Sequence, residues 1–235
     1  MSGIDAVLFD LDNTVHGRDW AFRSWAAWFV RERLGLADGP AAEGAVGFIT
    51  GLDPGGRSPK AAMFGRIKER YPALPDAADA LALAFRTEML AYLGGLDPAT
   101  VRLLDGLDHR RIPWGIVTNG SAGQIERVRA LGLAGRTRCV VVSEVVGVRK
   151  PATAIFLLAA ARLGADPRRT DFVGDNPESD IVGAAAAGMR TAWLRHGRAW
   201  PEALLPVAPH FVVDALAEIL PLLGSAEPDK GRPSS

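Results

Sequence analysis

Asp10 and Asp12 are the first residues of the chain whose types and spacing could do chemistry, because they follow directly on an apolar run. Such a run before a polar turn is typical of a strand covered on both faces, as in a parallel sheet flanked by helices. Side chains two apart on a strand point the same way, so we expect the two carboxylates to lean towards each other. Like charges about 4 Å apart repel by about 4 kcal/mol at an effective dielectric of about 20. The pair therefore indicates a metal ion, a proton or both, unless it is only an acidic turn closing an ordinary strand.

A second polar segment, Thr118-Asn119-Gly120, follows the apolar residues Ile116 and Val117. It offers a hydroxyl group and backbone N–H groups where a strand ends and a helix begins. This combination is a natural binding site for an oxyanion. We therefore regard the three residues as a candidate anion site.

Lys150 and two further acids, Asp175 and Asp180, lie in the polar segments that come after the apolar runs ending at Val142 and Val173. The chain has four Lys residues against a large excess of Arg, so a Lys in the Arg-Lys-Pro turn departs from the local preference. All three Asn residues lie in these strand-end loops, although Asn favours turns in any case. Lys150 and Asp180 could instead form a plain ion pair between two helix starts.

The elements that must position these residues alternate between strand and helix. Strands are predicted near residues 4–9, 113–118, 138–142, 170–173, 190–194 and 211–213, with helices at 98–109, 121–131, 151–163 and 177–187 and a last one ending at 223. This alternation at βαβ spacing predicts an α/β fold with a doubly wound, largely parallel, Rossmann-like sheet. Ligands in such sheets bind beyond the carboxyl ends of the strands, which is where the polar residues lie.

Residues 16–95 read as helices with no strand among them, which predicts a small helical domain inserted into the α/β domain formed by 1–15 and 96–223. Phe22, Trp25 and Phe29 recur at helical spacing and are interpreted as the core of this insertion rather than as a ligand pocket. The tail at 224–235 is poor in apolar residues and is predicted to be disordered.

Composition narrows the class of protein. With 235 residues and zero formal net charge, the chain shows no general attraction to nucleic acid or to an anionic membrane. Its single cysteine, Cys139, excludes an internal disulfide framework and is interpreted as a core residue. No charged-then-apolar leader or membrane-length apolar run is present, so a cytoplasmic location is expected. The oligomeric state and any physiological partner are left open.

Four segments together resemble the motifs of the haloacid dehalogenase superfamily, in the superfamily's order. They are Asp10-Leu-Asp-Asn-Thr, Thr118-Asn-Gly, Lys150-Pro, and Gly174-Asp-Asn-Pro-Glu-Ser-Asp180. The insertion after the first motif is similar to the family's small helical cap. The short stretch between Thr118 and Lys150 leaves no room for the larger cap of the second type. The motif residues show no departure from the pattern, but nothing in the cap indicates one substrate.

The resemblance implies a phosphatase mechanism. Asp10 would attack phosphorus and become a transient aspartyl phosphate. Asp12 would protonate the departing oxygen and then activate water as a base. Thr118 and the backbone N–H groups around Asn119 and Gly120 would bind phosphoryl oxygens.

The resemblance also implies a magnesium site. Asp175 would bind Mg²⁺ together with a carboxylate oxygen of Asp10 and the main-chain carbonyl of Asp12, because hard oxygen ligands suit this ion. Lys150 would bind phosphoryl oxygens and neutralise the developing charge. Asp180 would steady Lys150 or a metal-bound water without itself holding the metal.

We therefore expect Mg²⁺-dependent hydrolysis of a small phosphorylated metabolite. A phosphotransferase of the sugar-phosphate mutase type, a 2-haloacid dehalogenase and a non-catalytic binding protein that keeps the fold remain alternatives. Weaker candidates are His16, read as a solvated loop residue, and three cap residues that could face a second substrate anion, Arg23, Arg57 and Lys60. His109, His196 and His210 lack ligand spacing and are read as incidental.

Overall fold

The computed structural model describes residues 3–201 and 207–223, so the tail predicted to be disordered lies outside the described residues. The chain divides into two compact units, Met1–Val15 with Leu96–Ser235, and His16–Gly95. The first unit contains a sheet and the second contains only helices. None of the described helices is long and apolar enough to cross a membrane.

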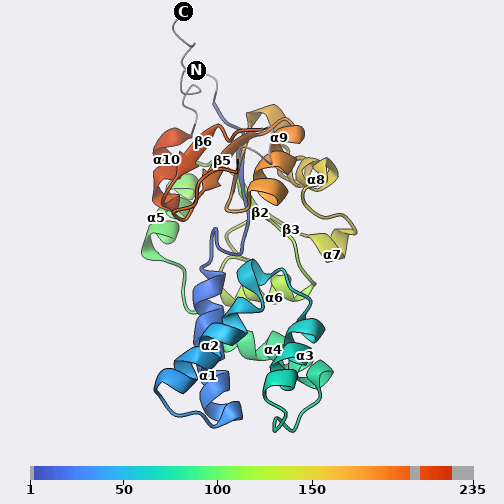
Figure 1. The fold of residues 1–235 in the computed structure, drawn as a ribbon. Helices are drawn as coiled ribbons and strands as arrows, with labels where there is room; N and C mark the ends of the chain where they lie inside the picture. Colours follow the sequence, from blue (N-terminus) through green and yellow to red (C-terminus); the bar gives the residue numbers. More distant parts are fainter. Residues whose placement is uncertain (1–2, 202–206, 224–235) are drawn as a thin grey trace, which may run out of the picture. The chain divides into compact units, whose positions relative to one another are not determined.

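The sheet of the first unit has six strands in the order β3-β2-β1-β4-β5-β6, and every neighbouring pair is parallel (Figure 1). The strands are β1 (Ala6–Phe9), β2 (Trp114–Thr118), β3 (Cys139–Val142), β4 (Thr170–Gly174), β5 (Arg190–Leu194) and β6 (Phe211–Val213). The chain builds outward from β1 to β3, then crosses back and builds outward from β4 to β6. This doubly wound order confirms the predicted fold class.

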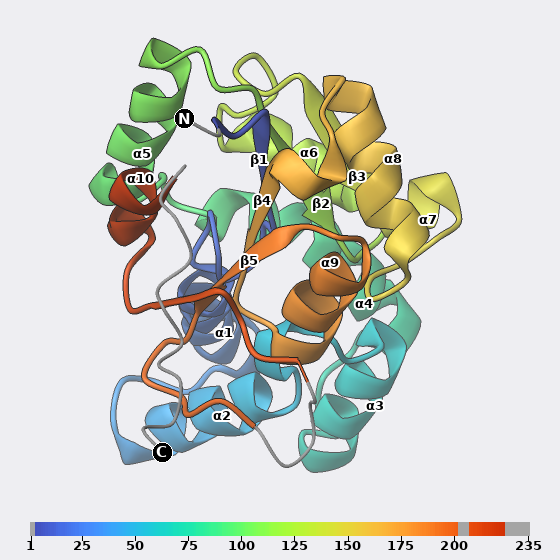
Figure 2. The same cartoon turned by 90° about the horizontal axis from the view of Figure 1, so that it is seen from above.

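Helices cover both faces of this sheet. The helices of the first unit are α5 (Pro98–His109), α6 (Gly123–Ala130), α7 (Ser143–Val146), α8 (Thr153–Leu163), η3 (Pro167–Arg169), η4 (Pro177–Val182), α9 (Gly183–Ala186), η5 (Leu216–Glu218) and α10 (Ile219–Leu222). Figures 1 and 2 show α8 and α9 on one face, with α5 and α10 on the other. The predicted helix at 177–187 begins as a π-helix, η4, and continues as the short α9.

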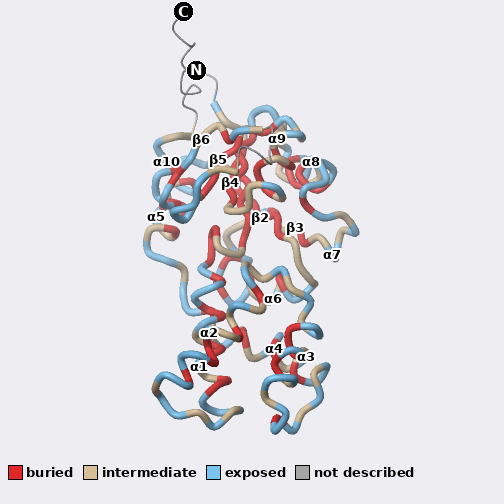
Figure 3. Tube along the Cα trace, viewed as in Figure 1, coloured by how far each residue is buried: buried red, intermediate tan, exposed pale blue. Residues whose placement is uncertain are grey.

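The strand register brings the predicted site residues to one edge of the sheet. Phe9, the last residue of β1, lies opposite Ile116 of β2 and Val173 of β4. Because all three strands run in the same direction, the residues that follow them emerge at their common carboxyl edge. The three central strands, β1, β2 and β4, are buried along their whole length and present polar loops at this edge; Figure 3 colours buried residues red.

The helical unit has its own core. Its elements are α1 (Arg18–Leu34), α2 (Pro40–Gly51), η1 (Pro54–Gly56), α3 (Lys60–Arg70), α4 (Ala78–Glu88) and η2 (Met89–Tyr92). Trp25 lies at its centre, with ring centroids 5.0 Å from Phe29, 5.9 Å from Phe64 and 4.6 Å from Phe85. These rings are buried, so the aromatic face of α1 packs in a core, as the sequence predicts.

Two polar residues of the helical unit are more buried than the sequence suggests. His16 was expected to be solvated, but it is only 3% exposed and its Nε2 lies 2.8 Å from the carbonyl oxygen of Leu93. The expectation is wrong because His16, at the start of the helical unit, packs against Leu93, near the end of the same unit. Asp53 is fully buried and forms ion pairs with Arg18 and Lys60.

Candidate functional site

Three carboxylates gather at the carboxyl edge of the sheet. Asp10 follows β1, Asp175 follows β4, and Asp180 lies in η4. One ligand oxygen from each lies within 4.8 Å of the others. Asp10 and Asp180 are buried, and Asp175 is partly buried. Three negative groups at this spacing repel one another strongly and require positive charge between them.

Lys150 supplies part of that charge. Its Nζ lies 2.6 Å from Oδ1 of Asp10 and 2.7 Å from Oδ1 of Asp180. Burial of the ammonium group acts to lower its pKa, but the Asp10 and Asp180 carboxylates outweigh burial, and the pKa of Lys150 lies above its ordinary value. Lys150 is therefore a permanent cation inside the site.

The contact with Lys150 only partly balances the negative charge of Asp10. Burial raises the pKa of Asp10 well above its ordinary value, Lys150 opposes the rise, and Asp180 and Asp175 add to it. The rise comes first from burial and then from the two neighbouring carboxylates, and Lys150 offsets only part of it. A further cation at this position would relieve the imbalance.

Asp180 is held by the local sequence around η4. Its Oδ2 accepts a hydrogen bond of 3.0 Å from the backbone N–H of Asn176. The Asn176 side chain in turn accepts hydrogen bonds from the N–H groups of Glu178 and Ser179 and so caps the helix. A side chain at Gly174 would overlap with Asp180, so glycine makes this approach possible.

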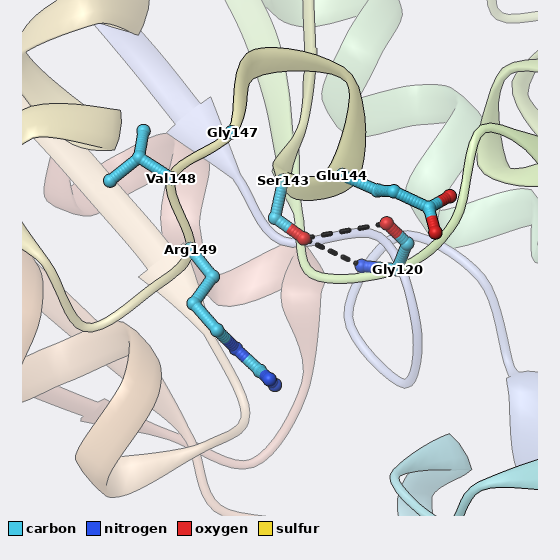
Figure 4. A pocket seen from close by; sticks show the side chains of 6 residues that line it. All are labelled: Gly120, Ser143, Glu144, Gly147, Val148 and Arg149. Atoms are coloured by element: carbon cyan, nitrogen blue, oxygen red, sulfur yellow. Dashed lines mark hydrogen bonds between the residues drawn. The ribbon is translucent and has the colours of Figure 1, made fainter.

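Asn119 ties the Thr118 loop to the Lys150 turn. Its amide nitrogen donates to the Lys150 carbonyl at 2.9 Å, and its amide oxygen accepts from the Lys150 N–H at 2.9 Å. The N–H of Gly120 donates to Oγ of Ser143 at 3.0 Å, so this predicted phosphoryl donor is already engaged. The two residues line a pocket of about 400 Å³. Figure 4 shows their contact, with Arg149 also lining the pocket.

Asp12 departs from the geometry expected for it. The sequence predicted that its carboxylate would lean towards Asp10, but it is not part of the three-carboxylate cluster. Its oxygens lie 2.8 and 2.9 Å from Nη1 of Arg127, and Nε2 of Gln124 donates to it at 2.9 Å. The expectation is wrong because β1 ends at Phe9, and the alternation of a strand does not continue through the following turn.

The turn itself explains this departure. Asn13 adopts a left-handed conformation with φ of 62°, which Asn tolerates better than most residues. The N–H of Thr14 donates to the carbonyl of Leu11 at 3.4 Å, so the chain folds back within a few residues. Asp12 is thereby directed to α6.

The loop after β5 supplies contacts that the sequence reasoning missed. Arg198 donates to the carbonyl oxygen of Asp175 at 2.6 Å and to its Oδ2 at 3.1 Å. His196, read as incidental, lies with Nε2 2.7 Å from the carbonyl oxygen of Asn13. One sequence feature could have predicted these contacts. Arg195, His196 and Arg198 follow a strand of the same sheet, as the other site residues do.

Asp175 has the properties of a metal ligand. Burial raises its pKa, Asp180 adds to the rise, and Arg198 and His196 oppose it, with a resulting pKa of about 6. The negative charges of the Asp175 and Asp10 carboxylates are thus only partly balanced by neighbouring positive groups. Oxygen ligands of this kind fit Mg²⁺.

The sequence is similar to a family of hydrolases and to several phosphatases. A family model for haloacid dehalogenase-like hydrolases matches residues 4–188. N-acetylmuramic acid 6-phosphate phosphatase from Pseudomonas aeruginosa is 31% identical over 202 residues, which cover 85% of each chain. Phosphoserine phosphatase from Thermus thermophilus is 33% identical over 136 residues, which cover 57% of this chain and 54% of that protein. The chain thus spans about half the length of the first curated relatives it matches.

Solved structures share the fold. The HAD-hydrolase YfnB from Bacillus subtilis bound to magnesium has a TM-score of 0.76 at 22% identity, covering 95% of this chain and 100% of that one. A 2-haloacid dehalogenase from Pseudomonas syringae has a TM-score of 0.61 at 27% identity, covering 94% and 98%. The fold is therefore found with more than one chemistry.

Proposed function

Because this chain is a member of the haloacid dehalogenase-like hydrolases, we propose that it hydrolyses a small phosphate monoester through an aspartyl phosphate. The observation that carries the proposal is the position of Lys150, whose Nζ lies between Asp10 and Asp180 beside the partly buried Asp175. This arrangement combines a nucleophile, a fixed cation and a candidate metal ligand at one strand edge.

In this mechanism Oδ of Asp10 attacks the phosphorus atom, and the ester oxygen departs with the bonding electrons. Asp12 gives that oxygen a proton, and it later takes a proton from the water that attacks the aspartyl phosphate. Lys150 and the hydroxyl of Thr118 bind the phosphoryl oxygens on which charge develops.

The residues that would hold Mg²⁺ are Asp10 and Asp175, with the main-chain carbonyl of Asp12. When bound, the ion supplies positive charge to the phosphoryl oxygens. Asp180 fixes Lys150 and does not need to touch the ion.

The direct experiment is a panel of phosphorylated metabolites assayed for phosphate release with Mg²⁺ and with EDTA. We expect Mg²⁺-dependent release from at least one small monoester, and no release when EDTA is present. Full activity in metal-free buffer would contradict the proposed mechanism.

Metal binding should depend on pH, because the ion must displace the proton that Asp175 holds below its pKa of about 6. Addition of Mg²⁺ is therefore expected to raise the melting temperature more at about pH 7.5 than at about pH 5. Asp175→Asn, which cannot become a carboxylate, is the matched control and should show a small Mg²⁺ effect at both values. An equal Mg²⁺ effect on the wild-type protein at both pH values would contradict the assignment of Asp175.

We further propose that the helical unit acts as the cap that selects the substrate. Among its candidate cations, Arg23 pairs with Glu43 and Lys60 with Asp53. Within the described residues Arg57 is exposed and makes no hydrogen bond or ion pair, so it is the cation available to a second anionic group of a substrate.

Arg57→Ala is expected to raise KM about tenfold or more for a substrate with a second anionic group, as loss of a charged hydrogen bond does. Small aryl phosphates, which lack that group, should be unaffected. Arg66→Ala is the control, since Arg66 is also exposed and pairs with Glu69 on α3. An equal loss on every substrate would contradict a role in selection.

Phosphotransfer to a second substrate would use the same Asp10 and Asp12. The assay separates the two reactions, because a phosphotransferase turns over only when an acceptor is present. A non-catalytic protein that keeps the fold would release no phosphate from any compound in the panel.

A further inference from the structure

Gln124 lies at the centre of a hydrogen-bond network that joins two residues of the proposed mechanism. It belongs to the first turn of α6 and is only 6% exposed. Its Nε2 donates to Oγ1 of Thr118 at 3.0 Å and to Oδ2 of Asp12 at 2.9 Å. One buried amide group thus contacts both the phosphoryl-binding hydroxyl and the acid–base carboxylate.

Arg127 fixes the orientation of this amide. Its Nη1 donates to Oε1 of Gln124 at 2.9 Å. A guanidinium group can only donate hydrogen bonds, so the atom of Gln124 that faces it must be the oxygen. The NH₂ group is then directed to Thr118 and Asp12, and the reversed amide would place two donors against each other.

The amide in turn determines what the Thr118 hydroxyl can do. Because Gln124 donates to Oγ1, the oxygen acts as the acceptor and its own hydrogen remains to be donated. Among the described residues, that hydroxyl has one other polar contact, to the carbonyl of Asn119 at 3.5 Å, which is long for a hydrogen bond between these groups. Thr118 is therefore set to donate to a phosphoryl oxygen.

The backbone leaves room for this arrangement at Gly120. A Cβ at that position would lie 2.8 Å from Cγ of Gln124 and 3.2 Å from its Nε2. Any other residue at this position would therefore force the Gln124 side chain to move. The glycine that follows Thr118-Asn119 thus lets Gln124 pack beneath the loop.

We propose that Gln124, oriented by Arg127, is a positioning residue for two catalytic groups: it directs the Thr118 hydroxyl hydrogen towards the phosphoryl group and restrains Asp12. This inference rests on the proposed function. It predicts that Gln124 contributes to phosphate affinity through Thr118, without touching the phosphate itself.

The test is the affinity of the Mg²⁺-loaded protein for inorganic phosphate, measured by calorimetry and as competitive inhibition. Gln124→Met keeps the size of the side chain but removes its donors, and should weaken phosphate binding about tenfold. Thr118→Val should have a similar effect. The double variant should bind phosphate no more weakly than Thr118→Val alone, because both substitutions remove the same interaction.

Either of two results would overturn the proposal: unchanged phosphate affinity in Gln124→Met, or an undiminished effect of Gln124→Met in the Thr118→Val background. Far-ultraviolet circular dichroism and the melting temperature establish that each variant is folded. If Gln124→Met does not fold, Arg127→Met provides the same test, because it leaves the Gln124 amide free to turn. Its loss of phosphate affinity should be smaller than that of Gln124→Met. Arg127→Lys should recover part of the affinity that Arg127→Met loses.

Arg129→Met is the matched control for Arg127→Met. Arg129 lies on the same helix and pairs with Glu126, but its side chain is 61% exposed. It should leave phosphate affinity unchanged, and an equal loss in both variants would show a general effect of helix charge and contradict the proposal.

Asp12 provides a second readout that a purely structural role would not change. In a single turnover, Gln124→Met should slow release of an alkyl leaving group more than release of an acidic phenol, which needs less protonation. An equal slowing of both would contradict the restraint of Asp12. If wild-type protein released no phosphate from any ester, the proposed function itself would fail, whereas these effects bear on Gln124 alone.

Discussion

Asp12→Asn is expected to lower the rate of hydrolysis of alkyl phosphates by about 10²–10⁴-fold. Asparagine keeps the size of the side chain and can still bond to Arg127 and Gln124, but it cannot transfer a proton. An alkyl phosphate leaves as an alkoxide-like oxygen that needs that proton. Steady-state rates on a series of phosphate esters, ordered by the acidity of the leaving group, would measure the effect.

The same variant distinguishes hydrolysis of phosphate esters from dehalogenation. A halide leaves as a stable anion and needs no acid, so a dehalogenase would not depend on Asp12 in this way. Asp105→Asn is the matched control, since that carboxylate is 62% exposed and pairs with Arg136. Full activity of Asp12→Asn on alkyl phosphates, or metal-independent release of halide from 2-haloacids by the wild-type protein, would overturn the phosphatase assignment.

Lys150→Met is expected to have the second largest effect, because the substitution removes a cation and leaves two buried carboxylates unpaired. Loss of one group that stabilises the transferring phosphoryl oxygens costs on the order of 10²–10³-fold in rate. Breaking a buried ion pair by removing one partner destabilises the fold by about 3–5 kcal/mol. Phosphate release and urea unfolding would measure the two effects separately.

The loss of stability should depend on pH in a defined direction. Burial raises the pKa of Asp10 above its value in the unfolded chain, Asp180 and Asp175 add to the rise, and removal of the lysine removes the charge that opposes it. A carboxyl group with a raised pKa contributes stability that is fully present below its pKa in the unfolded chain, about 4. That contribution is lost as the pH rises through the raised pKa of the folded state. The deficit of Lys150→Met relative to the wild-type protein should therefore be small near pH 4 and large near pH 7.

Asp180→Asn provides the compensating change. Added to Lys150→Met, it removes one of the two unpaired charges and should recover part of the lost stability at neutral pH. The rate should not recover, because the cation is still missing. A deficit of equal size at both pH values, or no recovery in the double variant, would contradict the electrostatic account of the site.

The sheet and its cluster of charged residues follow from sequence because they depend on short, local patterns. An apolar run that ends in Asp10, another that ends near Asp175, and a turn at Lys150 all lie at the same edge once the strands are parallel. Burial and strand direction suffice to bring these residues together. The helical unit likewise follows from the spacing of Phe22, Trp25 and Phe29.

The partners of Asp12 and Asp175 could not be predicted in the same way. Arg127 reaches Asp12 across 115 positions of sequence, and Arg198 reaches Asp175 from the loop that follows β5. Such contacts depend on the turn geometry at Asn13 and on where a helix face points, which residue spacing does not specify. The six-residue offset from Thr118 to Gln124 is more local and places Gln124 on the helix that the Thr118 loop opens.

The covalent intermediate tests the central claim most directly. Wild-type protein and Asp12→Asn, mixed with an aryl phosphate and Mg²⁺ and quenched in acid within one turnover, should carry one phosphoryl group. Peptide mass spectrometry should locate that group on Asp10, and Asp10→Asn should carry none. A phosphoryl group on any other residue, or substrate turnover that continues undiminished in Asp10→Asn, would contradict an aspartyl phosphate at Asp10.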